Sequence, residues 1–302
     1  MTVHFRHYKG EAGITDDYYK IRDFLVEIRS TSFTYARWDW MITHDYLDVN
    51  SINKIGVWQD SDKIVGIATF DLQLGVAYCL NLPEYAFLKK DMILYANDCL
   101  AKDNEIGIVI PDSDVHFQDA ATDLGFIATE NKEEDSIFYI AKTPIEITVP
   151  KGFEITSMEE TFDLQGYYRV LWKGFDHELN GEGDFCFSEA NKVSGKKQMI
   201  RPNVDLNLKI AIVSPKEDFV SYCGIWYEKK MDFAVIEPVA TDPEYRRMGL
   251  GKAAVLEGIR RAGELGAKRV LVGSSQQFYY NIGLRPYSTA TEWRPKNKRI
   301  SR

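Results

Sequence analysis

Four short segments in the first half of the chain each have a counterpart, in the same order, in the second half. The pairs are YYKI at 18–21 and YYRV at 167–170, VGIATF at 65–70 and CGIWYE at 223–228, PEY at 83–85 and 243–245, and DLGF at 123–126 and NIGL at 281–284. Ordered matches at similar offsets indicate a duplicated domain. At 302 residues the chain also has the usual length of two domains. We therefore predict one domain over 1–145 and a second over 146–302.

The second copy reads as alternating strands and helices. After a helical stretch around 160–180, strands are expected in LNLKIAIVS, DFVSYCGIWYE, MDFAVIEPVAT, KRVLVGSS and STATEWRP. Apolar residues recur every three or four positions from Val255 to Leu265, which predicts an amphipathic helix closed by Gly266. QQFYYNIG reads as a short second helix. This order predicts a mixed α/β fold with a partly parallel sheet.

Charge and cysteine usage narrow the function classes. Residues 1–145 carry 13 Lys and Arg against 24 Asp and Glu, which disfavours nucleic acid as a partner. The chain starts without an apolar leader and has no membrane-length apolar run, so we expect a cytoplasmic protein without a membrane partner. Its oligomeric state is left open, a homodimer included. The cysteines and histidines lack metal-ligand spacing, so we expect no metal and four buried, unpaired thiols, Cys79, Cys99, Cys186 and Cys223.

The segment PEYRRMGLGKAA, at 243–254, places arginines and glycines where the predicted helix begins. The first amides of a helix lack intrahelical acceptors, and the helix dipole makes that end partly positive. Glycine lets a ligand approach the backbone closely. We predict that the amides of Met248 to Lys252 hold a diphosphate and that Arg246 adds a charge-assisted bond.

Two other nucleotide motifs fit this segment less well. A P-loop needs Ser or Thr after its lysine, whereas Lys252 is followed by Ala253. A dinucleotide fingerprint matches formally at Gly249, Gly251 and Ala254, but the acidic residue expected about 20 positions further on is missing. A hydride-transferring oxidoreductase is therefore a disfavoured alternative.

PEYRRMGLG resembles the acyl-CoA signature (Arg/Gln)-x-x-Gly-x-(Gly/Ala) of the GNAT superfamily of N-acetyltransferases, and FYYNIGL resembles that family's (Leu/Phe)-Tyr-x-x-x-Gly-(Phe/Leu) segment. The resemblance implies acetyl-CoA as cosubstrate, with its pyrophosphate held by the signature. The residues expected at the acetyl-CoA site are Val239, Ala240, Arg246, Arg247, Met248, Gly249, Leu250, Gly251, Lys252, Ser274 and Ser275.

The first copy departs from this signature. Aligned on PEY, the positions of Arg246, Gly249 and Gly251 are taken by Ala86, Lys89 and Asp91. Ala121 stands where the second copy has Tyr279. These long and acidic side chains would fill and partly repel an anion site. We predict a GNAT-like first domain without a cofactor site.

Two side chains are candidates for the chemistry. An alkyl ammonium must lose a proton before it attacks a thioester, and Glu237 on the strand before the signature is the candidate base, directly or through water. A structural carboxylate is the alternative. Tyr279, in the position of the family's tyrosine, is the candidate acid for the leaving thiolate; a packed ring is the alternative. Pro238 is typical of a bulge or an edge and fits a strand that splays from its neighbour, with a plain turn or sheet edge as the alternative. The resemblance implies that the Val239 amide there polarises the thioester oxygen.

The acceptor site is less legible. The resemblance implies that the first helices of the second copy and their loop line it, and we name Tyr168, Trp172 and Trp226 as candidate contacts. The predicted function is direct transfer of an acetyl group to a primary amine of a small molecule or peptide. A non-catalytic acyl-CoA sensor that keeps the diphosphate site is the main alternative.

Overall fold

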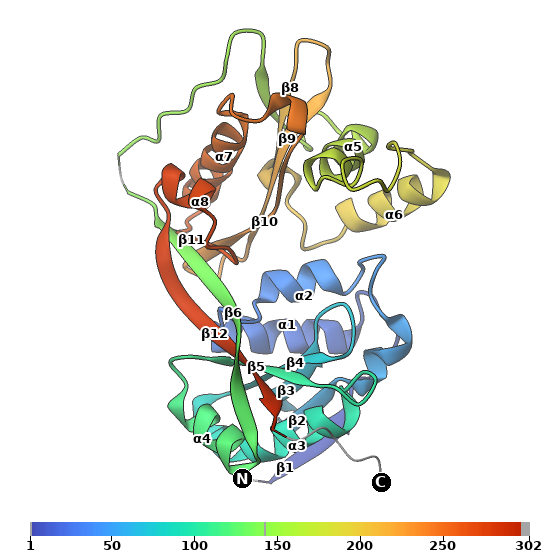
Figure 1. Cartoon of the computed structure of the whole chain (residues 1–302), viewed down its shortest axis with the longest axis vertical. Coiled ribbons are helices and arrows are strands. Elements are labelled where there is room, and N and C mark those ends of the chain that lie inside the picture. The colour runs from blue at the N-terminus through green and yellow to red at the C-terminus, as the bar shows by residue number, and fades with distance from the viewer. Residues whose placement is uncertain (1, 142, 297–302) are drawn as a thin grey trace. The chain divides into compact units, whose positions relative to one another are not determined.

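The computed structural model describes residues 2–141 and 143–296, which pack as two compact units (Figure 1). The first unit comprises residues 1–135 and 287–302, and the second comprises residues 136–286. Each unit is a mixed α/β layer structure, as the sequence predicts. Across the described residues, no helix combines the length and the apolar composition that a membrane crossing requires.

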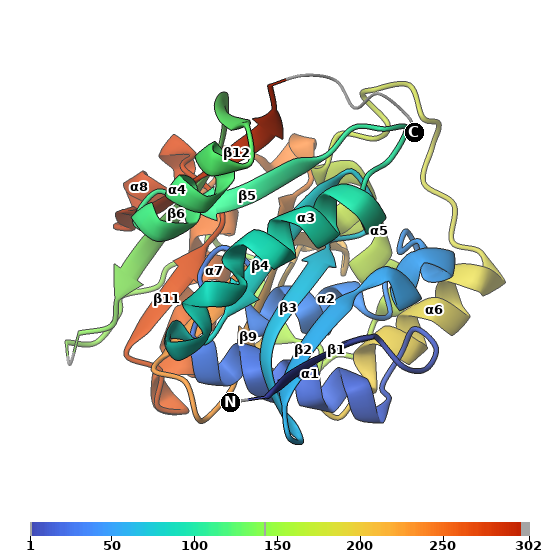
Figure 2. The same cartoon turned by 90° about the horizontal axis from the view of Figure 1, so that it is seen from below.

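The first unit is built on a sheet with the strand order β1-β2-β3-β4-β5-β12-β6. Helices α1 and α2 cover one face of this sheet, and α3 covers the other (Figures 1 and 2). Its elements are β1 (Val3–His7), α1 (Asp16–Ile28), α2 (Tyr35–Met41), η1 (Val49–Lys54), β2 (Gly56–Asp60), β3 (Lys63–Phe70), β4 (Val76–Asn81), η2 (Pro83–Leu88), α3 (Lys89–Cys99), β5 (Gly107–Pro111), α4 (Val115–Asp123) and β6 (Phe126–Tyr139).

The second unit repeats this plan with the strand order β11-β10-β9-β8-β7. Helix α7 packs on one face of the sheet and α5 on the other (Figure 1). Its elements are β7 (Glu154–Ser157), α5 (Leu164–Gly174), α6 (Glu189–Met199), η3 (Leu206–Leu208), β8 (Lys209–Val213), β9 (Phe219–Tyr227), β10 (Phe233–Thr241), η4 (Pro243–Tyr245), α7 (Leu250–Glu264), β11 (Arg269–Val272) and α8 (Gln277–Ile282). The last strand, β12 (Arg285–Pro295), starts in this unit and continues in the first.

Helix α7 forms where the apolar period predicts it. Val255, Ile259 and Ala262 are fully buried in the core of the second unit. The helix ends at the predicted glycine, because Gly266 adopts a left-handed φ of 113° that other residues rarely take.

The last strand of each half of the sequence takes part in the other unit's sheet. From Tyr287 onward β12 belongs to the first unit, where it pairs antiparallel with β5 from Trp293 to Ala290. In return, residues 136–139 of β6 pair antiparallel with β11 in the second unit. The two packed units therefore differ from the sequence boundaries 1–145 and 146–302, because the end of β6 packs with the second unit and most of β12 packs with the first.

Cysteine burial differs from the expectation at one position. Cys79 and Cys223 are buried and Cys99 is partly buried, but Cys186 is exposed, so its prediction as a buried thiol is wrong. Cys186 lies in the irregular loop between α5 and α6, where no periodic pattern predicts which side chains face solvent. All four thiols are free. Residues 2–141 and 143–296 contain no cluster of His, Cys, Asp or Glu that could hold a metal ion.

Candidate acetyl transfer site

Strand β10 contains a bulge at the candidate base. Its antiparallel register with β9 shifts between Ile236 and Val239, so that Glu237 and Pro238 together stand opposite Gly224. A β-carbon on Gly224 would lie 2.5 Å from the carbonyl oxygen of Glu237. Only glycine fits at position 224, because any side chain there would clash with the bulged backbone of Glu237.

Beyond the bulge β10 separates from its other neighbour. The parallel pairing of β10 with β11 runs from Phe233 to Val235, whereas β10 itself continues to Thr241. The strand therefore splays on one side, as Pro238 predicts. Glu237 and Val239 lie at the start of this opening, and both are partly exposed.

Trp226 supports the bulge from β9. Its indole nitrogen donates a hydrogen bond of 2.9 Å to the carbonyl oxygen of Glu237. The Lys209 ammonium lies 3.7 Å from the centre of the same ring and donates to the carbonyl oxygen of Ile225 at 2.9 Å. With only 5% of its surface exposed, Trp226 fixes the backbone at Glu237.

We expect Trp226→Phe to destabilise the second unit by about 1–2 kcal/mol more than Trp58→Phe destabilises the first. Both indoles are 5% exposed. Trp226 makes the bond to Glu237, whereas the indole nitrogen of Trp58 donates no hydrogen bond within the described residues. Urea unfolding of both variants measures the difference, and equal losses would contradict the supporting role.

The backbone ahead of α7 has the features that an anion site needs. Arg247 and Gly249 adopt left-handed φ angles of 68° and 83°. The first bond of the helix runs from the amide of Ala253 to the carbonyl of Gly249, so in the described part of the chain the amides of residues 247–252 lack acceptors. A β-carbon on Gly249 would meet nothing within 4 Å, so the space beside this residue is open. The residues present therefore fit a diphosphate.

The two signature glycines differ in their surroundings. Gly249 faces open space, but a β-carbon on Gly251 would lie 3.0 Å from the Thr241 hydroxyl and 3.3 Å from the Phe278 ring. Gly251 is buried and allows α7 to pack closely against the end of β10 and against α8.

Tyr279 lies on α8 with its side chain buried. Burial raises the pKa of its phenol well above the usual range, and the Cys223 thiol and the Glu237 carboxylate act in the same direction. The hydroxyl is therefore protonated at neutral pH, and it has no hydrogen-bond partner among the described residues. A tyrosine that keeps its proton at neutral pH can donate it to a departing thiolate, which is what a general acid must do.

The comparison with known families decides the assignment of this region. The model of the acetyltransferase (GNAT) family matches residues 184–283. These residues form a GNAT acetyltransferase domain. They contain the bulge, the start of α7 and Tyr279, so every feature described above lies within the matched region.

Solved structures extend the likeness to the whole chain. A GCN5-related N-acetyltransferase from Sphaerobacter thermophilus is 13% identical with a TM-score of 0.57, covering 97% of this chain and 95% of that protein. A tandem GNAT protein from the clavulanic acid biosynthesis pathway is 10% identical with a TM-score of 0.57, covering 99% and 100%. At such identities the likeness is one of fold, and it confirms two tandem GNAT-like domains. No curated protein matches the sequence.

The first unit has lost the start-of-helix geometry of the GNAT domain. Its counterpart segment runs through η2 directly into α3, and the amide of Lys89 donates to the carbonyl of Ala86. Lys89 is buried, with 8% of the residue exposed, and its ammonium forms a 2.5 Å ion pair with Asp114. Lys89, the counterpart of Gly249, adopts right-handed helical angles (φ −54°, ψ −43°) in place of the left-handed ones. The absence of a cofactor site from the first copy stays a prediction.

Arg246 of the GNAT domain has protein partners of its own. Its guanidinium donates to the Asp176 carboxylate at 2.6 Å and to the carbonyl oxygens of Gly174 and Thr241. The signature arginine therefore ties the end of β10 to the end of α5. A bond to a phosphate, as the sequence predicts, remains a prediction and would have to be added to these contacts.

Two of the predicted acceptor residues, Tyr168 and Trp172, lie on α5, whereas Trp226 lies on β9. Trp172 stacks on His177 at 4.3 Å and donates to the carbonyl of Gly183 at 3.2 Å, which holds the loop against the helix. The Tyr168 ring packs beside Phe187. Their contact with a substrate stays a prediction.

Two further candidate residues of the GNAT domain lie after β11. The carbonyl of Ser274 accepts a hydrogen bond from the Ser136 hydroxyl, and its own hydroxyl accepts from the amide of Gln276. Ser275 follows it in the same loop, and both residues are partly exposed.

Sequence reasoning missed Gly224 and the pairing of Asp176 with Arg246. The repeat held a signal for the glycine, because VGIATF and CGIWYE both contain glycine at the second position. Nothing in the local pattern around Asp176 indicated that it pairs with Arg246, since the two residues are 70 positions apart.

Proposed function

We propose that the protein is an acetyl-CoA-dependent N-acetyltransferase that transfers an acetyl group directly to a primary amine of a small molecule or peptide. The observation that carries the proposal is the presence of three features in one GNAT domain: the splayed end of β10 at Glu237, the acceptor-free amides before α7, and the buried Tyr279 of α8. Each feature has a role in acyl transfer from a thioester.

Binding is proposed to rest on the backbone before α7. Amides of residues 247–252 would hold the pyrophosphate of acetyl-CoA, because the helix dipole and the open space at Gly249 both favour an anion there. The exposed Arg247 and Lys252 would add positive charge beside it. The opening beyond Val235 would admit the thioester end of the substrate.

Transfer then requires one bond to form and one to break. The amine nitrogen bonds to the thioester carbon, and the carbon–sulfur bond breaks to leave an amide and a thiolate. Glu237 takes the proton that the amine loses, and Tyr279 supplies a proton to the thiolate. Proton exchange with solvent returns both side chains to their starting states.

The acceptor would reach Glu237 from the side of α5. Most carboxylates of the loop after α5 are already engaged: Asp176 pairs with Arg246, Glu178 lies 3.5 Å from Lys173, and Glu182 lies 2.9 Å from His177. The exposed Asp184 has no such partner within the described residues. Few unpaired carboxylates therefore remain here to attract a cationic acceptor. We define the acceptor only by its class, a primary amine.

The test is thiol release from acetyl-CoA with a panel of primary amines at pH 7. We expect turnover with at least one amine and about a tenfold slower rate in Tyr279→Phe, because a thiolate leaving group needs only modest protonation. Tyr280→Phe, the neighbouring tyrosine on α8, serves as the matched control and should keep the rate.

The opposite outcome is also informative. Binding of coenzyme A without turnover for any amine would favour the non-catalytic acyl-CoA sensor. A lack of coenzyme A binding would overturn both functions.

A further inference from the structure

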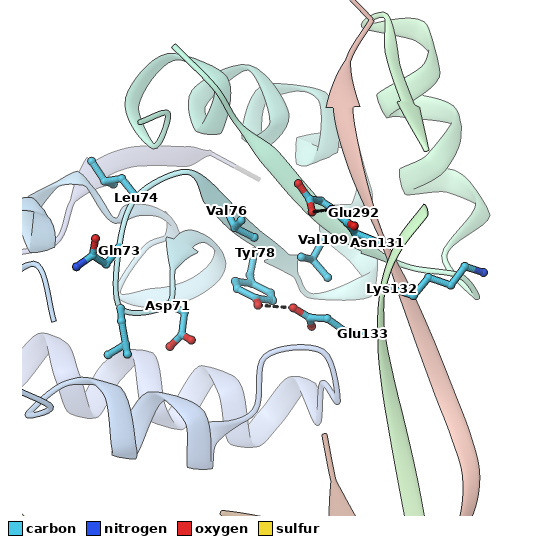
Figure 3. Close-up of a pocket in the computed structure, with 11 residues that line it drawn as sticks. Asp71, Gln73, Leu74, Val76, Tyr78, Val109, Asn131, Lys132, Glu133 and Glu292 are labelled. Atoms are coloured by element: carbon cyan, nitrogen blue, oxygen red, sulfur yellow. Dashed lines mark hydrogen bonds between the residues drawn. The ribbon is translucent and has the colours of Figure 1, made fainter. Parts of the chain in front are cut away.

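The first unit contains a cavity of its own, of about 440 Å³, which is within the range of small-molecule sites (Figure 3). It is lined from the β3–β4 turn, β4, β5, β6 and β12. The lining residues are Asp71, Leu72, Gln73, Leu74, Val76, Tyr78, Val109, Asn131, Lys132, Glu133 and Glu292. Four aliphatic side chains and three carboxylates are among these residues, so the cavity offers both apolar contacts and negative charge.

All but one of the charged side chains in the lining form ion pairs. Asp71 is paired with Arg37, Glu292 with Arg294 at 2.5 Å, and Lys132 lies 3.7 Å from Asp112. Glu133 is the exception: among the residues that the structure describes, no cation forms an ion pair with it. Its Oε1 accepts a hydrogen bond of 2.6 Å from the Tyr78 hydroxyl, as Figure 3 shows.

Two further observations indicate that the carboxylates of this wall could accept another hydrogen bond or a positive charge. The Oδ1 atom of Asp71 is buried and has no hydrogen-bond partner within the described chain, although Oδ2 is held by Arg37. Desolvation raises the pKa of the Glu133 carboxyl, with Asp135 and Asp71 acting in the same direction against the Tyr78 hydrogen bond and Arg37. An arriving cation would relieve both conditions.

We propose that this cavity binds a small organic cation, a primary ammonium on an aliphatic chain, with Glu133 as its counter-ion and Asp71 as a second acceptor. Leu74, Val76 and Val109 contact the aliphatic part. The excess of 24 acidic over 13 basic residues in 1–145 attracts cations toward the unit. The site lies wholly in the first unit and does not depend on acetyl transfer, because neither Glu237 nor the start of α7 belongs to it.

The test is an NMR titration of the full chain with n-butylammonium chloride at pH 7, without acetyl-CoA. We expect saturable shifts of the amides of residues 71–78 and 131–133. Sodium butyrate and 1-butanol should produce no such shifts, because they share the aliphatic chain but not the positive charge.

Three variants locate the site. Glu133→Gln should weaken butylammonium binding at least tenfold, a loss of about 1.4 kcal/mol. Leu74→Trp, which fills the cavity from a partly exposed position, should weaken it as much. Glu134→Gln removes the same charge one residue along β6, outside the lining, and should change the affinity less than twofold. Equal weakening by Glu133→Gln and Glu134→Gln, equal binding of butyrate, or shifts confined to other residues would overturn the proposal.

Discussion

Glu237→Gln is expected to lower kcat/KM for acetyl transfer at pH 7 by about 10² to 10⁴. An alkyl ammonium with a pKa near 10.4 is almost fully protonated at that pH, so without a base only a very small neutral fraction can attack. Glutamine has nearly the same shape but accepts no proton. The bulge should persist, because its hydrogen bond from Trp226 is made to the backbone carbonyl of residue 237.

Two measurements separate loss of the base from general damage. The deficit should shrink as the pH is raised toward the pKa of the amine, since the acceptor then loses its proton without help. Coenzyme A affinity should stay unchanged, because the amides before α7 are untouched. Glu217→Gln, in the turn between β8 and β9, is the control and should retain the parent rate. A Glu237→Gln protein with full activity at pH 7 would make this residue a structural carboxylate.

The fold followed from the sequence where the signal was local. Strands β8 to β11 and helix α7 lie in the predicted segments, because apolar period and glycine punctuation act within 10 to 15 residues. Short β7 carried too few residues for such a pattern. The exchange of β6 and β12 could not be inferred either, since a strand's own alternation says which face is buried and not which neighbour it pairs with.

The candidate site divides in the same way. The bulge at Pro238 and the glycine-rich start of α7 each had a motif behind them. Arg246 shows the limit: the motif suggested a phosphate contact, but the structure adds Asp176 and Gly174, which lie 70 and 72 residues earlier. Trp226 is predicted as an acceptor contact because it is aromatic and lies on a strand. Its hydrogen bond to the Glu237 carbonyl depends on how β9 pairs with β10, which the local sequence does not indicate.

Gly249→Val is expected to weaken coenzyme A binding by about 10 to 100 fold, the equivalent of losing one charge-assisted hydrogen bond. Gly249 has a φ of 83°, and the β-carbon of a valine there would meet no protein atom within 4 Å. Its side chain would instead occupy the space over the amides of residues 247–252. The left-handed backbone also disfavours valine by about 1–2 kcal/mol, which would pull the loop away from its present geometry.

Gly266→Val is the matched control, because it places the same residue at the other end of α7. Gly266 has a φ of 113°, and a β-carbon there would lie 3.3 Å from the Tyr227 hydroxyl. Both variants should therefore lose thermal stability through backbone strain, but only Gly249→Val should lose coenzyme A affinity in calorimetry. If both variants bound coenzyme A as the parent does, the diphosphate would lie elsewhere. If both lost binding equally, the effect would belong to the stability of α7 and not to the space over its first amides.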